Sequence, residues 1–122
     1  MNQLETLKAS GALRVVLTDA NGNVKEDVQL KNLVVNTGLN FIVSRMKDAT
    51  ATAMTHMELG TGTTAAAAAD TALGAAISGS RQALTSTTVS SNTITYVASF
   101  GAGTGTGAVT EAGIFNASSA GT

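Results

Sequence analysis

Two segments of the sequence have the pattern of a strand, a turn and a returning strand, which restricts the chain to a fold with much antiparallel β-structure. In residues 12–32, the run ALRVVLT precedes Asn21-Gly22, a pair that tolerates the positive φ of a tight hairpin turn. In residues 81–100, a turn at 90–92 separates two strands. Along the second of these, apolar and mostly polar positions alternate, which predicts one buried and one exposed face. The apolar positions are Ile94, Tyr96, Ala98 and Phe100.

A short amphipathic helix is predicted over residues 39–48, LNFIVSRMKD. Its apolar residues recur at helical spacing, so they form one stripe that we expect to pack on a sheet. These residues are Leu39, Ile42, Val43 and Met46. Asn36 or Thr37 is the expected N-cap, because the side chains of both residue types accept hydrogen bonds from free backbone N–H groups.

The remaining segments alternate between strands and loops of small residues. Residues 54–59 are expected to form a strand, and residues 108–115 the last strand, after a glycine-alternating loop. Residues 60–80 are rich in Ala, Thr and Gly and offer few large side chains to hold a helix in place. They are predicted to form a long contact-making loop, with one helical turn at 65–73.

Large side chains for a core are scarce. The 122 residues include three Phe, one Tyr and no Trp, and alanine inflates the 43% hydrophobic content. Stability is therefore expected to depend partly on neighbouring subunits. The predicted fold is mainly β, an antiparallel sandwich or jelly roll with one short helix. Residues 1–11 are expected to be an N-terminal extension, and residues 12–122 a single β-rich domain.

Charge and cysteine usage exclude several classes of function. Seven Lys and Arg are scattered among eight Asp and Glu, for a net charge of −1. Nucleic-acid or anionic-membrane partners are therefore disfavoured, because both require clustered cations. With no cysteine, disulfides and thiolate metal sites are excluded. No signal peptide or apolar run of transmembrane length is recognisable, so the protein is expected to be made and used in soluble form.

The polar residues that most resemble a catalytic or metal site do not form a complete one. His56 and Glu58 fall on one face of a predicted strand, but no third or fourth metal ligand clusters nearby. Glu111 is expected to make a polar contact at a strand end rather than act as a general base. Asn116 begins a glycosylation sequon, a short pattern that assigns no function here.

The glycine-rich segments lack the context of a phosphate-binding loop. Neither residues 60–62 nor residues 101–107 are closed by Gly-Lys-Ser or Gly-Lys-Thr, and neither lies between a strand and a helix. A serine triad is unsupported, since the chain has one His and no G-x-S-x-G. No catalytic, cofactor-binding or metal-binding residue is therefore assigned, no cofactor is expected, and the chain is predicted not to be an enzyme.

Four segments of the sequence, in this order, resemble segments of a known protein family: LKNLVVNTGLNFIVSRM (30–46), MTHMELGTGTTAAAAADTALG (54–74), ALTSTTVSSNTITYVASF (83–100) and GTGAVTEAGIF (105–115). Together they cover about the last two thirds of the chain. They resemble tailed-bacteriophage virion structural proteins, a family found among capsid cement or decoration proteins and tail-fibre modules. Proteins that resemble this one often continue into further β-structure after the TEAGIF strand.

The resemblance implies a capsid cement protein on the virion surface, assembled in the bacterial host cytoplasm. Its partners would be the major capsid protein and copies of itself, with residues 1–11 and 60–80 as the contact segments. An alternative is a tail-fibre or baseplate module that forms a trimer and contacts a host surface receptor. A particle-borne glycan hydrolase is a further alternative, but it requires a carboxylate pair about 5 to 10 Å apart, for which the scattered Asp and Glu give no reason.

Overall fold

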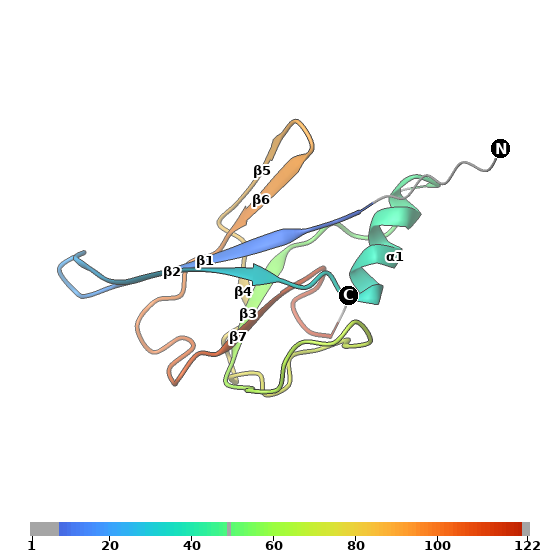
Figure 1. Ribbon diagram of the computed structural model, residues 1–122. Coiled ribbons are helices and arrows are strands. Elements are labelled where there is room, and N and C mark those ends of the chain that lie inside the picture. The colour runs from blue at the N-terminus through green and yellow to red at the C-terminus, as the bar shows by residue number, and fades with distance from the viewer. Residues whose placement is uncertain (1–7, 49, 121–122) are drawn as a thin grey trace.

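The computed structural model describes residues 8–48 and 50–120, and its fold is mainly β, as predicted (Figure 1). All of its paired strands are antiparallel. The elements, in chain order, are β1 (Gly11–Thr18), β2 (Val24–Asn32), α1 (Asn36–Arg45), β3 (His56–Gly60), β4 (Gln82–Ala83), β5 (Ser86–Ser90), β6 (Thr93–Val97) and β7 (Glu111–Phe115).

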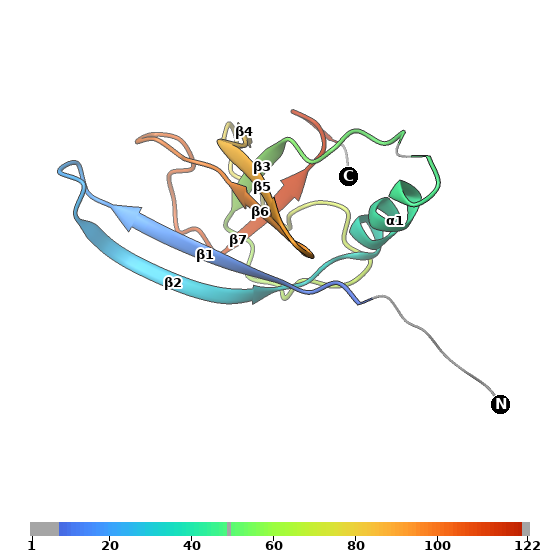
Figure 2. The same cartoon turned by 90° about the horizontal axis from the view of Figure 1, so that it is seen from above.

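The strands form three separate small sheets. Strands β1 and β2 pair with each other, β5 and β6 pair with each other, and β3 lies between β4 and β7. No Cα atom in one sheet lies within 8 Å of a Cα atom in a strand of another sheet or in α1. Figure 2 shows the β1–β2 hairpin as a long, curved arm beside the other two sheets. A sandwich or jelly roll is not confirmed by this arrangement and stays a prediction.

The first predicted hairpin is confirmed. Strands β1 and β2 pair in register, with Leu13 opposite Leu30 and Val15 opposite Val28. The connection is a loop of residues 19–23 rather than a two-residue turn. Its backbone is organised by the Asp19 carboxylate, which accepts hydrogen bonds from two N–H groups of the loop, and glycine supplies the one positive φ there, at Gly22.

The helix forms three residues earlier than predicted and ends at Arg45 instead of Asp48. The expected N-cap is wrong. Val35 occupies the cap position without a side-chain hydrogen bond, and the backbone N–H of Asn36 donates to the carbonyl of Ala68 at 2.7 Å. The 60–80 loop thus supplies an acceptor for one of the free N–H groups in the first turn of the helix.

The predicted apolar stripe of the helix is not buried against a sheet. Leu39 and Val43 are exposed, and Met46 is 81% exposed, whereas Ile42 is half-buried. The half-buried face of the helix instead includes Phe41.

The long loop at 60–80 is confirmed, but the helical turn at 65–73 is wrong. The N–H of Asp70 donates to the carbonyl of Ala67, and the Asp70 carboxylate accepts from the N–H of Ala67 at 2.8 Å, which closes a tight turn. A carboxylate that accepts a hydrogen bond from a nearby backbone N–H group in this way competes with helix formation.

The hairpin predicted in residues 81–100 is confirmed by β5 and β6, but the strand expected over 81–89 is divided between two sheets. Its first part is β4, which pairs with β3, and its second part is β5. Ser91 takes a positive φ of 53° in the turn. The predicted face is only half-buried, at Tyr96, Ala98 and Phe100, and Ile94 is exposed.

The core is small and lies on the β4–β3–β7 sheet. Within the described ranges, Met57 and Phe115 are the only buried hydrophobic side chains. The buried polar side chain is Ser80, which has no exposed surface. Its hydroxyl accepts from the N–H of Leu59 at 3.1 Å and donates to the carbonyl of Leu59 at 2.9 Å. One hydroxyl thereby fixes the end of the 60–80 loop to β3.

Ser80→Ala is expected to lower the free energy of unfolding by about 1 to 2 kcal/mol, because the buried N–H of Leu59 would lose its acceptor. Urea denaturation measures this change. The exposed Ser90 offers a matched control, and Ser90→Ala is expected to alter stability by less than about 0.5 kcal/mol. Equal effects of the two substitutions would contradict a specific role of the Ser80 hydroxyl.

Candidate functional site

A largely buried ion pair stabilises the β4–β3–β7 sheet. Arg81 donates to both carboxylate oxygens of Glu58, at 3.2 and 3.1 Å, and the two side chains are only 13% and 15% exposed. The Arg81 guanidinium also lies 3.8 Å from the centroid of the Phe115 ring. It donates further to the carbonyls of Ala117 and Ala120. Arg81 therefore connects β3, β7 and the segment that follows β7.

A second polar contact holds the 60–80 loop in place. The carboxylate of Glu111, at the start of β7, accepts hydrogen bonds from the N–H groups of Gly62, Gly74 and Ala75 at 3.0, 3.0 and 2.7 Å. The hydrogen bond from Ala75, followed by those from Gly74 and Gly62, outweighs desolvation and lowers the pKa of Glu111 below its usual value of 4.5. The sequence-based expectation of a strand-end polar contact at Glu111 is confirmed.

The Glu111 contact also explains the glycines that superficially suggest a phosphate site. At Gly62, an added Cβ would lie 2.6 Å from a Glu111 oxygen, so a side chain there would displace the carboxylate from its present position. The backbone N–H groups that could have surrounded a phosphate are already occupied by the protein's own carboxylate. This arrangement supports a structural rather than a phosphate-binding interpretation of residues 60–62.

His56 and Glu58 contact different partners. The Nδ1 atom of His56 lies 2.7 Å from the Thr55 hydroxyl, and Glu58 is bound by Arg81. Within the described parts of the chain, no group of three or more His, Cys, Asp or Glu residues is arranged to hold a metal ion.

No helix among the described residues has the length and apolarity to cross a membrane.

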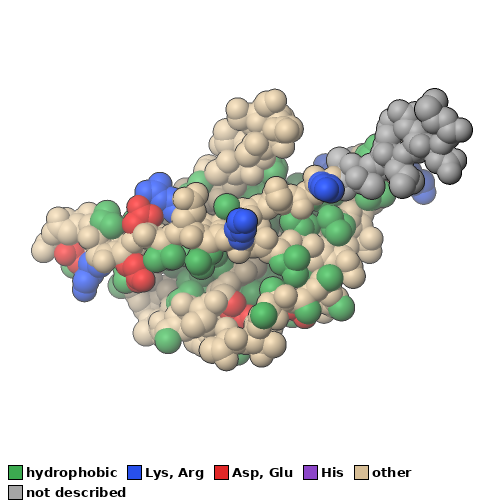
Figure 3. Space-filling model, in the orientation of Figure 1, with side chains coloured by type: hydrophobic (Ala, Val, Ile, Leu, Met, Phe, Trp, Pro, Cys, Tyr) green, Lys and Arg blue, Asp and Glu red, His purple; other side chains and the backbone are tan. Residues whose placement is uncertain are grey.

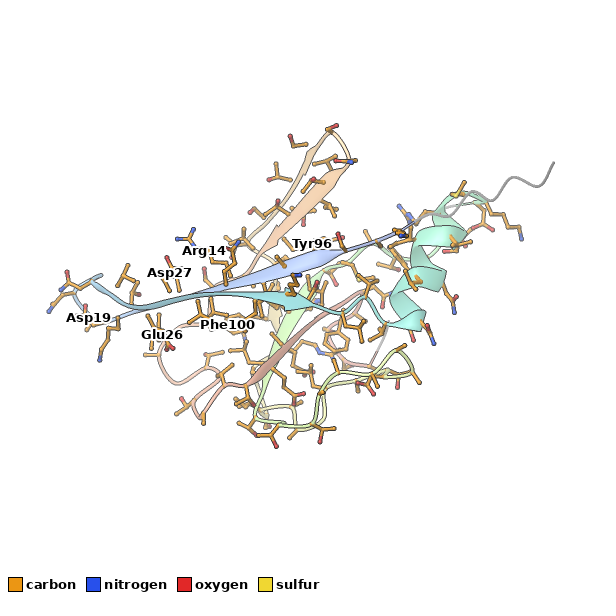
Figure 4. All side chains as sticks on the ribbon, viewed as in Figure 1. Arg14, Asp19, Glu26, Asp27, Tyr96 and Phe100 are labelled. Atoms are coloured by element: carbon orange, nitrogen blue, oxygen red, sulfur yellow. The ribbon has the colours of Figure 1, made fainter. Side chains whose placement is uncertain are left out.

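The most extensive candidate surface is the aliphatic face of the β1–β2 hairpin. Alternation along the strands puts five aliphatic residues on one face: Leu13, Val15, Leu17, Val28 and Leu30. Val15, Leu17 and Leu30 are exposed, and the other two are half-buried. The opposite face carries the Arg14–Asp27 ion pair, with an N···O distance of 2.7 Å (Figure 4).

This aliphatic face borders an open hollow of about 3510 Å³. Strand β2 contributes Glu26, Val28, Leu30 and Asn32 of this face and only Lys31 of the other, whereas β1 contributes residues of both faces, including Arg14 and Val16. Tyr96 and Phe100 line the same hollow from the body of the molecule. Figure 3 shows hydrophobic side chains gathered along the hairpin and in the hollow beside it.

Sequence reasoning found the hairpin but not its role as a surface. No buried face was predicted for this hairpin, and three aliphatic residues of one face are exposed: Val15, Leu17 and Leu30. The scarcity of aromatic residues could have indicated this exposed face, because a chain with few large side chains cannot cover all of its own apolar strands.

Of the two contact segments predicted from the sequence, the 60–80 loop is described and its backbone is held by Glu111. In the 1–11 extension, residues 1–7 lie outside the described residues, and Gly11 begins β1.

The chain matches no protein-family model, no curated protein and no solved structure.

Glu111→Gln is expected to lower the free energy of unfolding by about 2 kcal/mol, since the three N–H groups lose a charged acceptor. Chemical denaturation at fixed protein concentration measures this change. Glu26→Gln is the matched control, because Glu26 is exposed. A loss of similar size in both variants would show that net charge, rather than the three hydrogen bonds, is responsible.

Acid is expected to release the 60–80 loop. The folded-state pKa of Glu111 is lowered, so its stabilisation is fully present above pH 4.5 and is lost as the pH falls from there through the folded-state value. The protection factors of the Gly62, Gly74 and Ala75 amides, which are exchange rates corrected for their intrinsic pH dependence, should fall in this window when followed by NMR at decreasing pH. In Glu111→Gln, whose side chain does not titrate, the protection of the same amides should not change across this window, and a fall of equal size in that variant would contradict the assignment.

Proposed function

We propose that this chain is a structural subunit of a tailed-bacteriophage particle, a capsid cement protein that binds across junctions between major capsid proteins. The observation that carries this proposal is the aliphatic face of the β1–β2 hairpin, on which Val15, Leu17 and Leu30 are exposed. Large exposed apolar patches are typical of proteins that function by binding other proteins. The assignment to a phage particle is supported by the four resembling segments described above.

The loop at 60–80 is suited to be a second contact segment. The Glu111 carboxylate and the Ser80 hydroxyl fix its backbone on the β4–β3–β7 sheet before any partner binds. A contact loop that is already ordered loses less conformational entropy on binding, so more of the interaction energy contributes to affinity. Each copy would contact two capsid subunits at once, and many such contacts add through multivalency.

The candidate acid–base groups support a structural rather than an enzymatic role. Glu58 is neutralised by Arg81 and Glu111 is saturated by backbone N–H groups. A general base must instead be free to take a proton from a substrate. We accordingly propose that the protein is not an enzyme and uses no cofactor, and that it acts on the capsid surface of the virion.

Binding to phage heads that lack the protein tests this function. We expect saturable co-sedimentation with such heads and a higher temperature of shell rupture. Ala66→Arg, in the exposed part of the 60–80 loop, is expected to weaken binding at least about tenfold, the effect of losing roughly 1.4 kcal/mol. Ser90→Arg, at the tip of the β5–β6 hairpin, is the control and should bind normally.

Two outcomes would contradict the cement assignment. Absence of binding to heads, combined with a stable trimer that adheres to host cells, would assign the chain to a tail fibre or baseplate instead. Binding without any change in heat resistance would show that the protein decorates the shell but does not stabilise it.

A further inference from the structure

The loop that connects β1 and β2 contains a pair of residues that can react with each other. Asn21 is the only Asn of the sequence that is followed by Gly. Both residues are exposed, at the end of the long hairpin that Figure 2 shows beside the other sheets. Because glycine has no side chain, its backbone nitrogen can approach the side-chain carbonyl carbon of the preceding Asn with little steric hindrance. The loop therefore holds a nucleophile and an electrophile next to each other in contact with water.

The surroundings of Gly22 leave room for this approach. Gly22 has a φ of +82°, and a Cβ built on it would meet nothing within 4 Å. The neighbouring Asn23 is also exposed, but it is followed by Val24, whose β-branched side chain crowds the backbone nitrogen. The same loop thus contains a reactive pair and an internal control for it.

Hydrogen bonds to Asp19 oppose the reaction. The N–H of Gly22, whose nitrogen would attack, donates to the carbonyl of Asp19 at 3.0 Å. The Asp19 carboxylate accepts from the N–H groups of Asn21 and Asn23 at 2.9 and 3.0 Å. The Gly22 nitrogen must leave its acceptor before it can reach the side chain of Asn21, so the closed loop slows the reaction. These contacts are few and exposed to solvent, so the loop opens more readily than a buried strand.

We propose that Asn21 is a site of spontaneous deamidation, and that Asp19 sets the rate by holding the loop closed. The Gly22 nitrogen gives its proton to hydroxide and attacks the Cγ atom of Asn21, and the side-chain amide nitrogen takes up a proton and leaves as ammonia. Water then breaks one of the two C–N bonds of the cyclic imide. One product has aspartate at position 21, and the other has isoaspartate, in which Cβ becomes part of the backbone.

Both products alter the connection between the strands. Each adds a negative charge near the Asp19 carboxylate, which accepts a hydrogen bond from the N–H of residue 21. Isoaspartate also lengthens the backbone by one carbon between the Asp19 carbonyl and the Gly22 N–H, which are bonded in the intact loop. Because loop length and turn geometry fix the register of a hairpin, the modification is expected to weaken the pairing of β1 with β2. The inference does not depend on the phage assignment.

Peptide mapping by mass spectrometry tests the proposal on the full chain. Trypsin cuts after Arg14 and Lys25, which places Asn21 and Asn23 in one peptide. During incubation of the folded protein at mildly alkaline pH, we expect Asn21 to be converted to aspartate and isoaspartate while Asn23 stays intact. Conversion at Asn21 should be faster in urea, where the loop contacts are lost. Equal rates at Asn21 and Asn23 in the folded protein would overturn the proposal.

Asp19→Ala tests the control of the rate by the loop. It removes two hydrogen bonds and should accelerate deamidation about tenfold, which corresponds to about 1.4 kcal/mol of activation free energy. Asp19→Asn keeps an oxygen acceptor and should react nearly as slowly as the wild type. Asp27→Ala is the matched control, because it also removes one carboxylate of the hairpin but lies in β2, outside the loop, and it should leave the rate unchanged.

Equal acceleration by Asp19→Ala and Asp27→Ala would contradict the role of Asp19, because it would show that the loss of negative charge, rather than of the loop contacts, is responsible. If Asp19→Ala fails to fold, the wild type alone decides. The same rate at Asn21 in the folded and the urea-unfolded wild type would show that the closed loop does not protect the site.

Discussion

The carboxylate of Glu111 performs a task that a larger hydrophobic core performs in most proteins of this size. It joins β7 to two distant points of the 60–80 loop through three backbone N–H groups. The loop consists mainly of Ala, Thr and Gly, so it has little apolar surface with which to hold itself down. Hydrogen bonds to a charged acceptor are among the stronger contacts available to such a segment.

Arg81 provides a second set of polar contacts on the same sheet. Arg81 pairs with Glu58, stacks on Phe115 and reaches the carbonyls after β7, so that one side chain replaces several apolar contacts. A buried ion pair contributes modestly to stability, because desolvation offsets most of the attraction. It does specify one arrangement of β3, β4 and β7, since removing either partner leaves an unpaired charge in a largely buried position.

Local features of the fold could be predicted from the sequence, whereas contacts between distant segments could not. Both hairpins and the loop at 60–80 follow from turn residues and β-periodicity, which act over a few neighbouring positions. Glu111 and Gly62 are 49 positions apart, and nothing in either segment alone specifies their contact. The stripe of α1 was identified correctly as apolar, but periodicity cannot show whether the same chain supplies a surface to cover it.

The polar contacts that hold the small sheet together and the exposed aliphatic face of the hairpin are related features of the fold. Because Glu111, Ser80 and Arg81 fix the small sheet and its loop by hydrogen bonds, the aliphatic residues of the hairpin are not required to hold that sheet together. They remain available for association, where burying each fully exposed aliphatic side chain contributes about 1.5 to 3 kcal/mol. The charged residues along β2, including Lys25 and Lys31, also discourage indiscriminate pairing of its free edge. A chain built in this way keeps its sheet ordered without relying on the aliphatic residues of the hairpin.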